Sequence, residues 1–244
     1  MNFTEKKKRF LSSSNLWRII IILVITFVAF GLRMQAAING PVEYDEPVYM
    51  HAAIDYSIDF LDRNWARLIE SDYNSEHPVF YKLVYGAVLA KTTRPTEYFT
   101  VPKSDPIIGL NDFQSILNLR LVSALFGSLA VCFISILNPL AGILLAIHTY
   151  AIKYSSVIYL EALPLWLSII SMIAFTKFLE GVNDKKITPF YTVCLLISAA
   201  TMGMAAASKY TYGVVGIAAA LYALYVVLIK NRHPRMLAPL TIWT

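Results

Sequence analysis

Apolar residues in this chain come in long blocks that short polar stretches separate. Six blocks approach the length of about 20 mostly apolar residues that a helix needs to cross a bilayer. The six blocks cover residues 16–38, 116–137, 139–153, 160–178, 188–208 and 211–229. The third is the shortest, and Asn138-Pro139 before it predicts a tight turn between two helices. The pattern predicts an all-α polytopic membrane protein with about six transmembrane helices.

A long polar segment, residues 39–115, lies between the first two blocks. Within it, apolar residues recur at spacings of three and four over residues 50–68, which predicts an amphipathic helix on the membrane surface or on other helices. A second run, residues 79–90, is too short to span, and Pro78 favours a helix start there. We therefore expect a first external loop with two juxtamembrane helices, followed by an irregular Pro-containing connection over 92–112.

Composition and charge distribution narrow the class of protein. Hydrophobic residues make up 57% of the chain and charged residues 15%, which is too apolar for an ordinary soluble domain. The net charge of +5 comes from basic clusters beside apolar blocks, at 6–9, 177–186 and 230–235. Six spans place all three clusters on one face, which the positive-inside rule makes cytoplasmic. We expect a single transmembrane domain over 1–244 with a cytoplasmic N-terminus, and no nucleic-acid partner.

The external loop is acidic. Residues 39–115 hold 12 of the 16 acidic residues of the chain. Most of them have a plain interpretation as a solvated surface; Asp55, Asp59 and Asp62 fit the polar face of the first loop helix.

A set of eight ionisable residues, in the first loop and at the ends of the predicted spans, falls on the external face. They are Asp45, Glu46, Glu76, His77, Arg120, Lys153, Glu161 and Lys209. Ionisable groups near the hydrocarbon are costly, so their convergence indicates a site. A carboxylate can deprotonate a hydroxyl, and cations can hold a phosphate leaving group, which fits group transfer from a lipid phosphate. For Lys153 and Lys209, snorkelling to headgroups is an equally good interpretation.

Five ordered segments resemble those of the GT-C membrane glycosyltransferases, with the dolichyl-phosphate-mannose protein mannosyltransferases and the aminoarabinose lipid A transferases as the nearest branches. The segments are Asp45-Glu46-Pro47-Val48-Tyr49, Glu76-His77-Pro78-Val79-Phe80-Tyr81-Lys82-Leu83, Arg120-Leu121-Val122-Ser123-Ala124-Leu125-Phe126-Gly127, Tyr154-Ser155-Ser156 with Glu161-Ala162, and Ala207-Ser208-Lys209-Tyr210-Thr211. Their order and spacing agree with the family from residue 16 to 230.

The resemblance implies a GT-C-like fold and an inverting transfer of a sugar from a polyprenyl-phosphate donor to an acceptor hydroxyl on a protein, lipid or glycan. Asp45 matches the catalytic base, and Glu46 would support it. Arg120, Lys209 and His77 match positions that handle the donor phosphate, and Glu161 matches a pocket carboxylate. We also expect substrate contacts from three further residues, Tyr49, Lys82 and Lys153.

Some members of the family bind a divalent metal ion near the second segment, and Glu76 with His77 would supply two ligands, fewer than a metal site usually has. The chain departs from the family at Val48, Val79 and Ser156, which leaves the donor open. It also stops within another apolar segment, 236–243, where the family continues, so we expect a fragment.

Two rival functions remain open. A transporter or flippase of an amphiphilic lipid-linked substrate predicts ionisable residues at mid-membrane and internal repeats. An inactive, truncated scaffold predicts that Asp45 and Glu46 can be exchanged without loss of function. The expected location is the plasma membrane, or the endoplasmic reticulum in a eukaryote, with the active face external or lumenal.

Overall fold

The computed structural model describes residues 13–70, 73–92, 113–183 and 188–230, and every regular element in them is helical. Three of the expected features lie outside this part of the chain: the basic clusters at 6–9 and 231–235, the connection over 93–112, and the apolar segment 236–243.

Five of the six apolar blocks form helices that are long and apolar enough to cross a membrane. These helices are α2 (Ser13–Asn39), α6 (Phe113–Leu137), α9 (Ala162–Asn183), α10 (Pro189–Ala206) and α11 (Gly213–Leu224), which continues as a π-helix over Tyr225–Lys230. Large apolar side chains such as Leu23, Phe27 and Ile217 point outward. Such a surface is stable in lipid rather than in water, which favours a membrane-embedded protein.

The block at 139–153 was predicted to be one helix, and this prediction is wrong. It forms two short helices, α7 (Pro139–Ile147) and α8 (Thr149–Tyr154). The chain is extended at His148, whose Nδ1 accepts a hydrogen bond from the Ala151 N–H at 3.2 Å and so caps α8. The predicted Asn138-Pro139 turn is confirmed, because the Asn138 side chain caps α7 with Pro139 in its first turn.

Arg33 of α2 stabilises the break between α7 and α8. Its side chain is buried and donates to the carbonyls of Leu145 and Ala146, at 3.4 Å each, and to Ser155 Oγ at 2.8 Å. The last carbonyls of a helix have no partner within the helix, and a cation there also complements the helix dipole. Arg33 therefore supplies hydrogen-bond donors to the carbonyls that the interruption leaves without helical partners.

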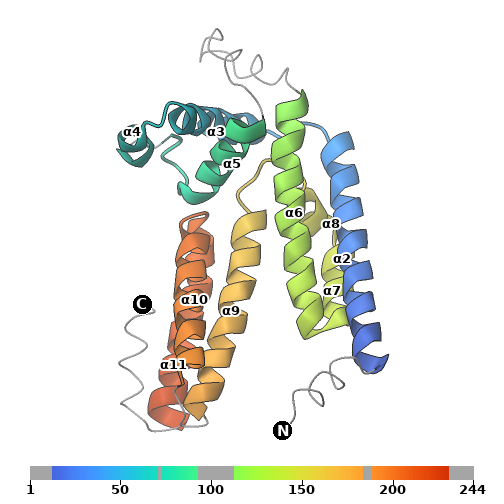
Figure 1. Ribbon diagram of the computed structural model, residues 1–244, viewed down its shortest axis with the longest axis vertical. Coiled ribbons are helices and arrows are strands. Elements are labelled where there is room, and N and C mark those ends of the chain that lie inside the picture. Colours follow the sequence, from blue (N-terminus) through green and yellow to red (C-terminus); the bar gives the residue numbers. More distant parts are fainter. Residues whose placement is uncertain (1–12, 71–72, 93–112, 184–187, 231–244) are drawn as a thin grey trace.

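The α7–α8 pair carries the chain from one end of the bundle to the other (Figure 1). At the lower end, Arg18 Nη2 of α2 donates to the Ile136 carbonyl of α6 at 2.7 Å. At the upper end, Lys153 of α8 forms an ion pair of 2.9 Å with Glu43, just after α2. The two short helices thus cover the distance for which the sequence predicted a single helix.

Three helices of the first loop lie across the upper end of the bundle (Figure 1): α3 (Glu46–Leu61), α4 (Trp65–Glu70) and α5 (Phe80–Thr92). The single helix predicted over 50–68 is wrong, because the chain turns at Arg63, which has a φ of 54°. α3 packs tightly on α5, and a Cβ on Gly86 would lie only 2.6 Å from the Tyr56 Cβ.

The solvated position expected for Asp59 is also wrong. Its side chain is buried, pairs with Arg67 at 3.4 Å, and accepts a hydrogen bond from the Tyr73 hydroxyl at 3.1 Å. The pairing ties the end of α3 to α4 and to the following loop.

Candidate functional site

Glu46 and Arg120 form a buried ion pair between the start of α3 and α6. Arg120 Nε donates to Glu46 Oε1 at 2.9 Å, and Nη2 donates to Oε2 at 2.6 Å. Two backbone N–H groups donate to the same carboxylate, Ile158 at 2.7 Å and Glu43 at 2.8 Å. The Glu46 carboxylate therefore joins α3, α6, the start of the first loop and the segment after α8.

The remaining donors of Arg120 go to the main chain at the end of α2. Nη1 donates to the carbonyls of Ala37 and Gly40 at 2.9 Å, and Nη2 donates to the Pro41 carbonyl at 2.7 Å. A guanidinium has five N–H donors, and these contacts use all of them. The geometry thus favours a structural role for both residues over the predicted catalytic support by Glu46 and phosphate binding by Arg120.

Asp45 differs from its neighbour Glu46 in having a free carboxylate. It occupies the N-cap position of α3, is exposed, and makes no side-chain capping hydrogen bond. Within the described part of the chain its carboxylate has neither a hydrogen-bond nor an ion-pair partner. The Glu46–Arg120 ion pair, with the main-chain groups bound to it, forms a clamp that holds the adjacent backbone. Asp45 therefore presents an accessible carboxylate from a rigid main chain.

Two tyrosines, Tyr49 and Tyr159, are close enough to Asp45 for its charge to raise their pKa values. The Tyr49 ring lies 6.1 Å from that of Tyr159 and 5.6 Å from the His77 ring. Burial raises the pKa of Tyr49, and the charges of Asp45, Glu161 and Glu76 raise it further. Burial, followed by the charge of Asp45, likewise raises the pKa of Tyr159 to about 12. Carboxylates from three distant segments thus converge on this pair of neutral phenols.

Lys82 of α5 holds the loop that carries Glu76 and His77. Its buried Nζ donates to the carbonyls of Tyr73, Asn74 and His77 at 2.7, 2.6 and 2.7 Å. An ammonium has three N–H donors, so none remains for the substrate contact predicted for Lys82. Its contacts instead fix the place of the His77 ring against Tyr49.

The pair predicted as metal ligands, Glu76 and His77, is exposed and half-buried respectively. Among the described residues, no group of three or more His, Cys, Asp or Glu side chains is placed to hold a metal ion. The described part of the chain therefore offers the predicted divalent metal no third ligand of these types.

Glu161 and Lys209 come together as an ion pair, although 48 positions separate them in the chain. Both side chains are half-exposed. The second oxygen of Glu161, Oε2, is buried and has no hydrogen-bond partner in the described part of the chain. The pair therefore retains an unused acceptor atom and a cation that solvent or a ligand can reach.

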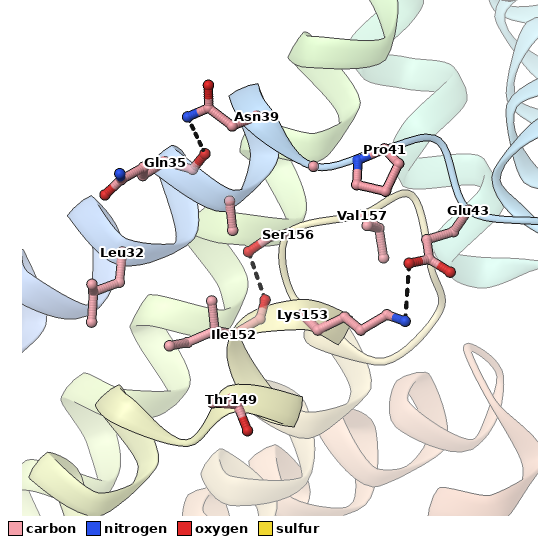
Figure 2. A pocket seen from close by; sticks show the side chains of 12 residues that line it. Leu32, Gln35, Asn39, Pro41, Glu43, Thr149, Ile152, Lys153, Ser156 and Val157 are labelled. Atoms are coloured by element: carbon pink, nitrogen blue, oxygen red, sulfur yellow. Dashed lines mark hydrogen bonds and ion pairs between the residues drawn. The ribbon is translucent and has the colours of Figure 1, made fainter.

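A groove runs between α2 and α8, with the pair formed by Lys153 and Glu43 at one side of it (Figure 2). It encloses about 770 Å³. Its walls mix apolar and polar side chains: Leu32, Gln35, Ala36 and Asn39 from α2, and Thr149, Ile152, Lys153, Ser156 and Val157 from α8 and the segment that follows. An amphiphile with an apolar tail and a polar head fits such a lining.

Sequence reasoning missed two residues of this region, Glu43 and Tyr159. Each lies two positions before a predicted site residue, Asp45 and Glu161 respectively. This proximity was the only signal, because acidic residues are common in the loop and tyrosines are common in the whole chain.

Comparison of the chain with protein-family models, with curated proteins and with solved structures finds no match.

Proposed function

We propose that this protein is a membrane glycosyltransferase of the GT-C type, which transfers a sugar from a polyprenyl phosphate to an acceptor hydroxyl. The proposal rests on the five segments that resemble that family and on one structural observation. This observation is the free, exposed carboxylate of Asp45 on a backbone that the buried Glu46–Arg120 clamp fixes. A general base needs a carboxylate that is accessible and precisely positioned.

The proposed orientation places the upper end of the bundle outside the cell or in the lumen. Lys177 lies toward the C-terminal end of α9, and the sequence that joins α9 to α10 contains Lys185-Lys186. Positively charged connecting segments stay in the cytoplasm. In this orientation α7 and α8 together act as a sixth, interrupted span. An interrupted helix is tolerated within a membrane where protein groups satisfy its backbone, as Arg33 does.

The donor enters sideways from the bilayer in this account. The groove between α2 and α8 takes the polyprenyl chain, and its polar rim lies at Glu43 and Lys153. Among the residues predicted to bind the donor phosphate, Lys209 and His77 are left to meet it, since the donors of Arg120 are occupied, as are those of Lys82. Lys209 would exchange its carboxylate partner, Glu161, for the phosphate.

The chemistry is a single displacement. The carboxylate of Asp45 accepts the proton of the acceptor hydroxyl while the acceptor oxygen attacks the anomeric carbon of the donor. The bond from that carbon to the phosphate oxygen breaks, the configuration inverts, and polyprenyl phosphate leaves with the bonding electron pair. Lys209 stabilises the charge that develops on the phosphate.

Sugar release from a polyprenyl-phosphate donor, measured with the wild type and with Asp45→Asn in nanodiscs, tests the proposal. We expect the variant to lose transfer while keeping its fold. Equal rates in the two proteins remove Asp45 as the base.

A flippase for a lipid-linked amphiphile is the second candidate, because of one observation. α7 and α8 form a broken helix next to the buried charge of Arg33, and transporters build their sites from such helices. The partners of Arg33, however, are main-chain carbonyls and Ser155, which cap the break. A fluorescent polyprenyl phosphate that crosses vesicle membranes at the same rate with and without the protein would exclude this function.

A further inference from the structure

The segment from His148 to Tyr159 carries a row of aromatic rings that leads to Asp45. In order, the contacting rings are those of His148, Tyr150, Tyr154, Tyr159, Tyr49 and His77, with centroids 5.6–6.2 Å apart. Tyr150, Tyr154 and Tyr159 lie nearly parallel, with angles of 15° and 23° between successive planes. The three rings therefore stack in succession.

Burial along the row increases toward Asp45. Tyr150 is 65% exposed, Tyr154 is 36% exposed, and Tyr49 is only 6% exposed. The accessible end is on α8, and the buried end is the wall beside the free carboxylate. The row therefore connects the outside of α8 with the proposed reaction centre.

Polar groups flank the accessible end. Lys153 Nζ lies 5.8 Å from the centre of the Tyr154 ring and pairs with Glu43. Together these two side chains carry no net charge, and both are partly exposed. They can donate and accept hydrogen bonds without favouring an ionic ligand.

We propose that Tyr150, Tyr154 and Tyr159 form a stacking platform for the ring of a neutral sugar, with Lys153 and Glu43 binding its hydroxyl groups. A sugar ring has an apolar face of C–H groups and a polar edge of hydroxyls, and an aromatic surface with hydrogen-bonding groups beside it matches both. This inference deepens the proposed function, on which it rests, by assigning the substrate class and the residues that select it.

An interfacial aromatic belt is the competing explanation for exposed tyrosines. The chain offers a matched control for it at the end of α11 and in the π-helix that follows, near the lower end of the bundle (Figure 1). Tyr222 and Tyr225 are similarly exposed and have ring centres 6.4 Å apart. An interfacial belt predicts that replacing either tyrosine pair changes sugar binding equally. A sugar platform predicts that only replacement of the α8 pair weakens sugar binding.

Saturation-transfer NMR with the protein in nanodiscs tests the platform without an activity assay. The probes are dodecyl maltoside and a dodecyl polyoxyethylene ether, which share a tail and differ in having a sugar. We expect saturation of the sugar-ring protons in the wild type. Replacement of both α8 residues, Tyr150→Ala with Tyr154→Ala, should weaken maltoside binding roughly tenfold and leave binding of the ether unchanged.

Three results would overturn the platform: equal maltoside binding by the wild type and the double alanine variant, an equal loss on replacing Tyr222 and Tyr225 with Ala, or an equal loss for the ether. Two further variants control for a folding defect. One replaces both residues, Tyr150→Phe with Tyr154→Phe, and the other is Tyr150→Ala alone, at the most exposed position. The phenylalanine pair should keep most of the binding.

The glycosyltransferase mechanism and the sugar platform can be contradicted independently of each other. Asp45→Asn should abolish transfer and keep maltoside binding. Transfer that depends on Asp45 but not on Tyr150 or Tyr154, with unchanged binding, contradicts the platform alone. Binding that depends on the tyrosines, with transfer that does not depend on Asp45, contradicts the glycosyltransferase mechanism alone.

Discussion

Glu46 and Arg120, 74 positions apart in the chain, face each other with both carboxylate oxygens bound to the guanidinium, at 2.9 and 2.6 Å. The pair is buried and lies one residue from the exposed Asp45. Its contacts with the end of α2 and with the segment after α8 make it the fixed point from which Asp45 is presented.

Arg120→Ala should lower the free energy of unfolding by about 3–5 kcal/mol, because it leaves the Glu46 carboxylate buried without its cation. Glu46→Gln should be milder, since its amide keeps the size and part of the hydrogen bonding. Denaturant unfolding in detergent measures both. The exposed pair of Lys177 and Glu180 is the control, for which Lys177→Ala should leave the stability nearly unchanged. Similar losses at the two pairs would contradict the clamp.

Lys82→Met should release the loop over 73–77, because three carbonyls lose their donor while the side-chain volume is kept. We expect protease cleavage within this loop and a loss of about 2–3 kcal/mol of stability. Lys91, which is exposed on the same helix, provides the matched Lys91→Met control. A loop that stays resistant to protease in Lys82→Met would show that other contacts hold it.

Gly86→Ala should destabilise the packing of α3 on α5 by about 1–3 kcal/mol, because the new methyl group meets the Tyr56 Cβ and the Ala53 carbonyl. Gly203→Ala, where nothing lies within 4 Å of the new methyl group, should leave the melting temperature unchanged or slightly raised. Thermal unfolding of both variants compares them directly, and an equal effect would argue against close contact of these helices.

Lys209→Ala should raise the KM for a polyprenyl-phosphate donor about tenfold or more, because a charged hydrogen bond to phosphate contributes about 1.5–3 kcal/mol. Lys209→Arg, which keeps the charge, should recover part of the affinity. Steady-state kinetics at varied donor concentration distinguish this from a loss of kcat. A KM and a kcat that both stay constant in Lys209→Ala would assign Lys209 to its ion pair with Glu161 alone.

The apolar blocks predicted most of the fold, because a helix in lipid must be apolar along about 20 residues and such runs are visible in the sequence. The interruption at His148 was not visible, since it depends on Arg33, more than a hundred positions away, satisfying the carbonyls of α7. The turn at Arg63 was hidden for a similar reason: the apolar spacing continues across it although the backbone does not.

The sequence also predicted which residues gather at the upper end of the bundle, but not their roles. Residue type does not distinguish Asp45 from Glu46, and burial does, because one carboxylate is exposed and the other has four donors. The same holds for the cations: Arg120 and Lys82 are saturated by internal partners, whereas Lys209 remains accessible.

The rate of sugar transfer from a polyprenyl-phosphate donor by Asp45→Asn, at saturating donor and acceptor, decides whether Asp45 is the catalytic base. The matched control is Asp62→Asn, which changes an exposed carboxylate at the far end of α3. We predict that Asp45→Asn lowers kcat by about 10²–10⁴-fold with unchanged thermal stability, and that Asp62→Asn transfers at the wild-type rate. Transfer at the wild-type rate by Asp45→Asn would contradict the account.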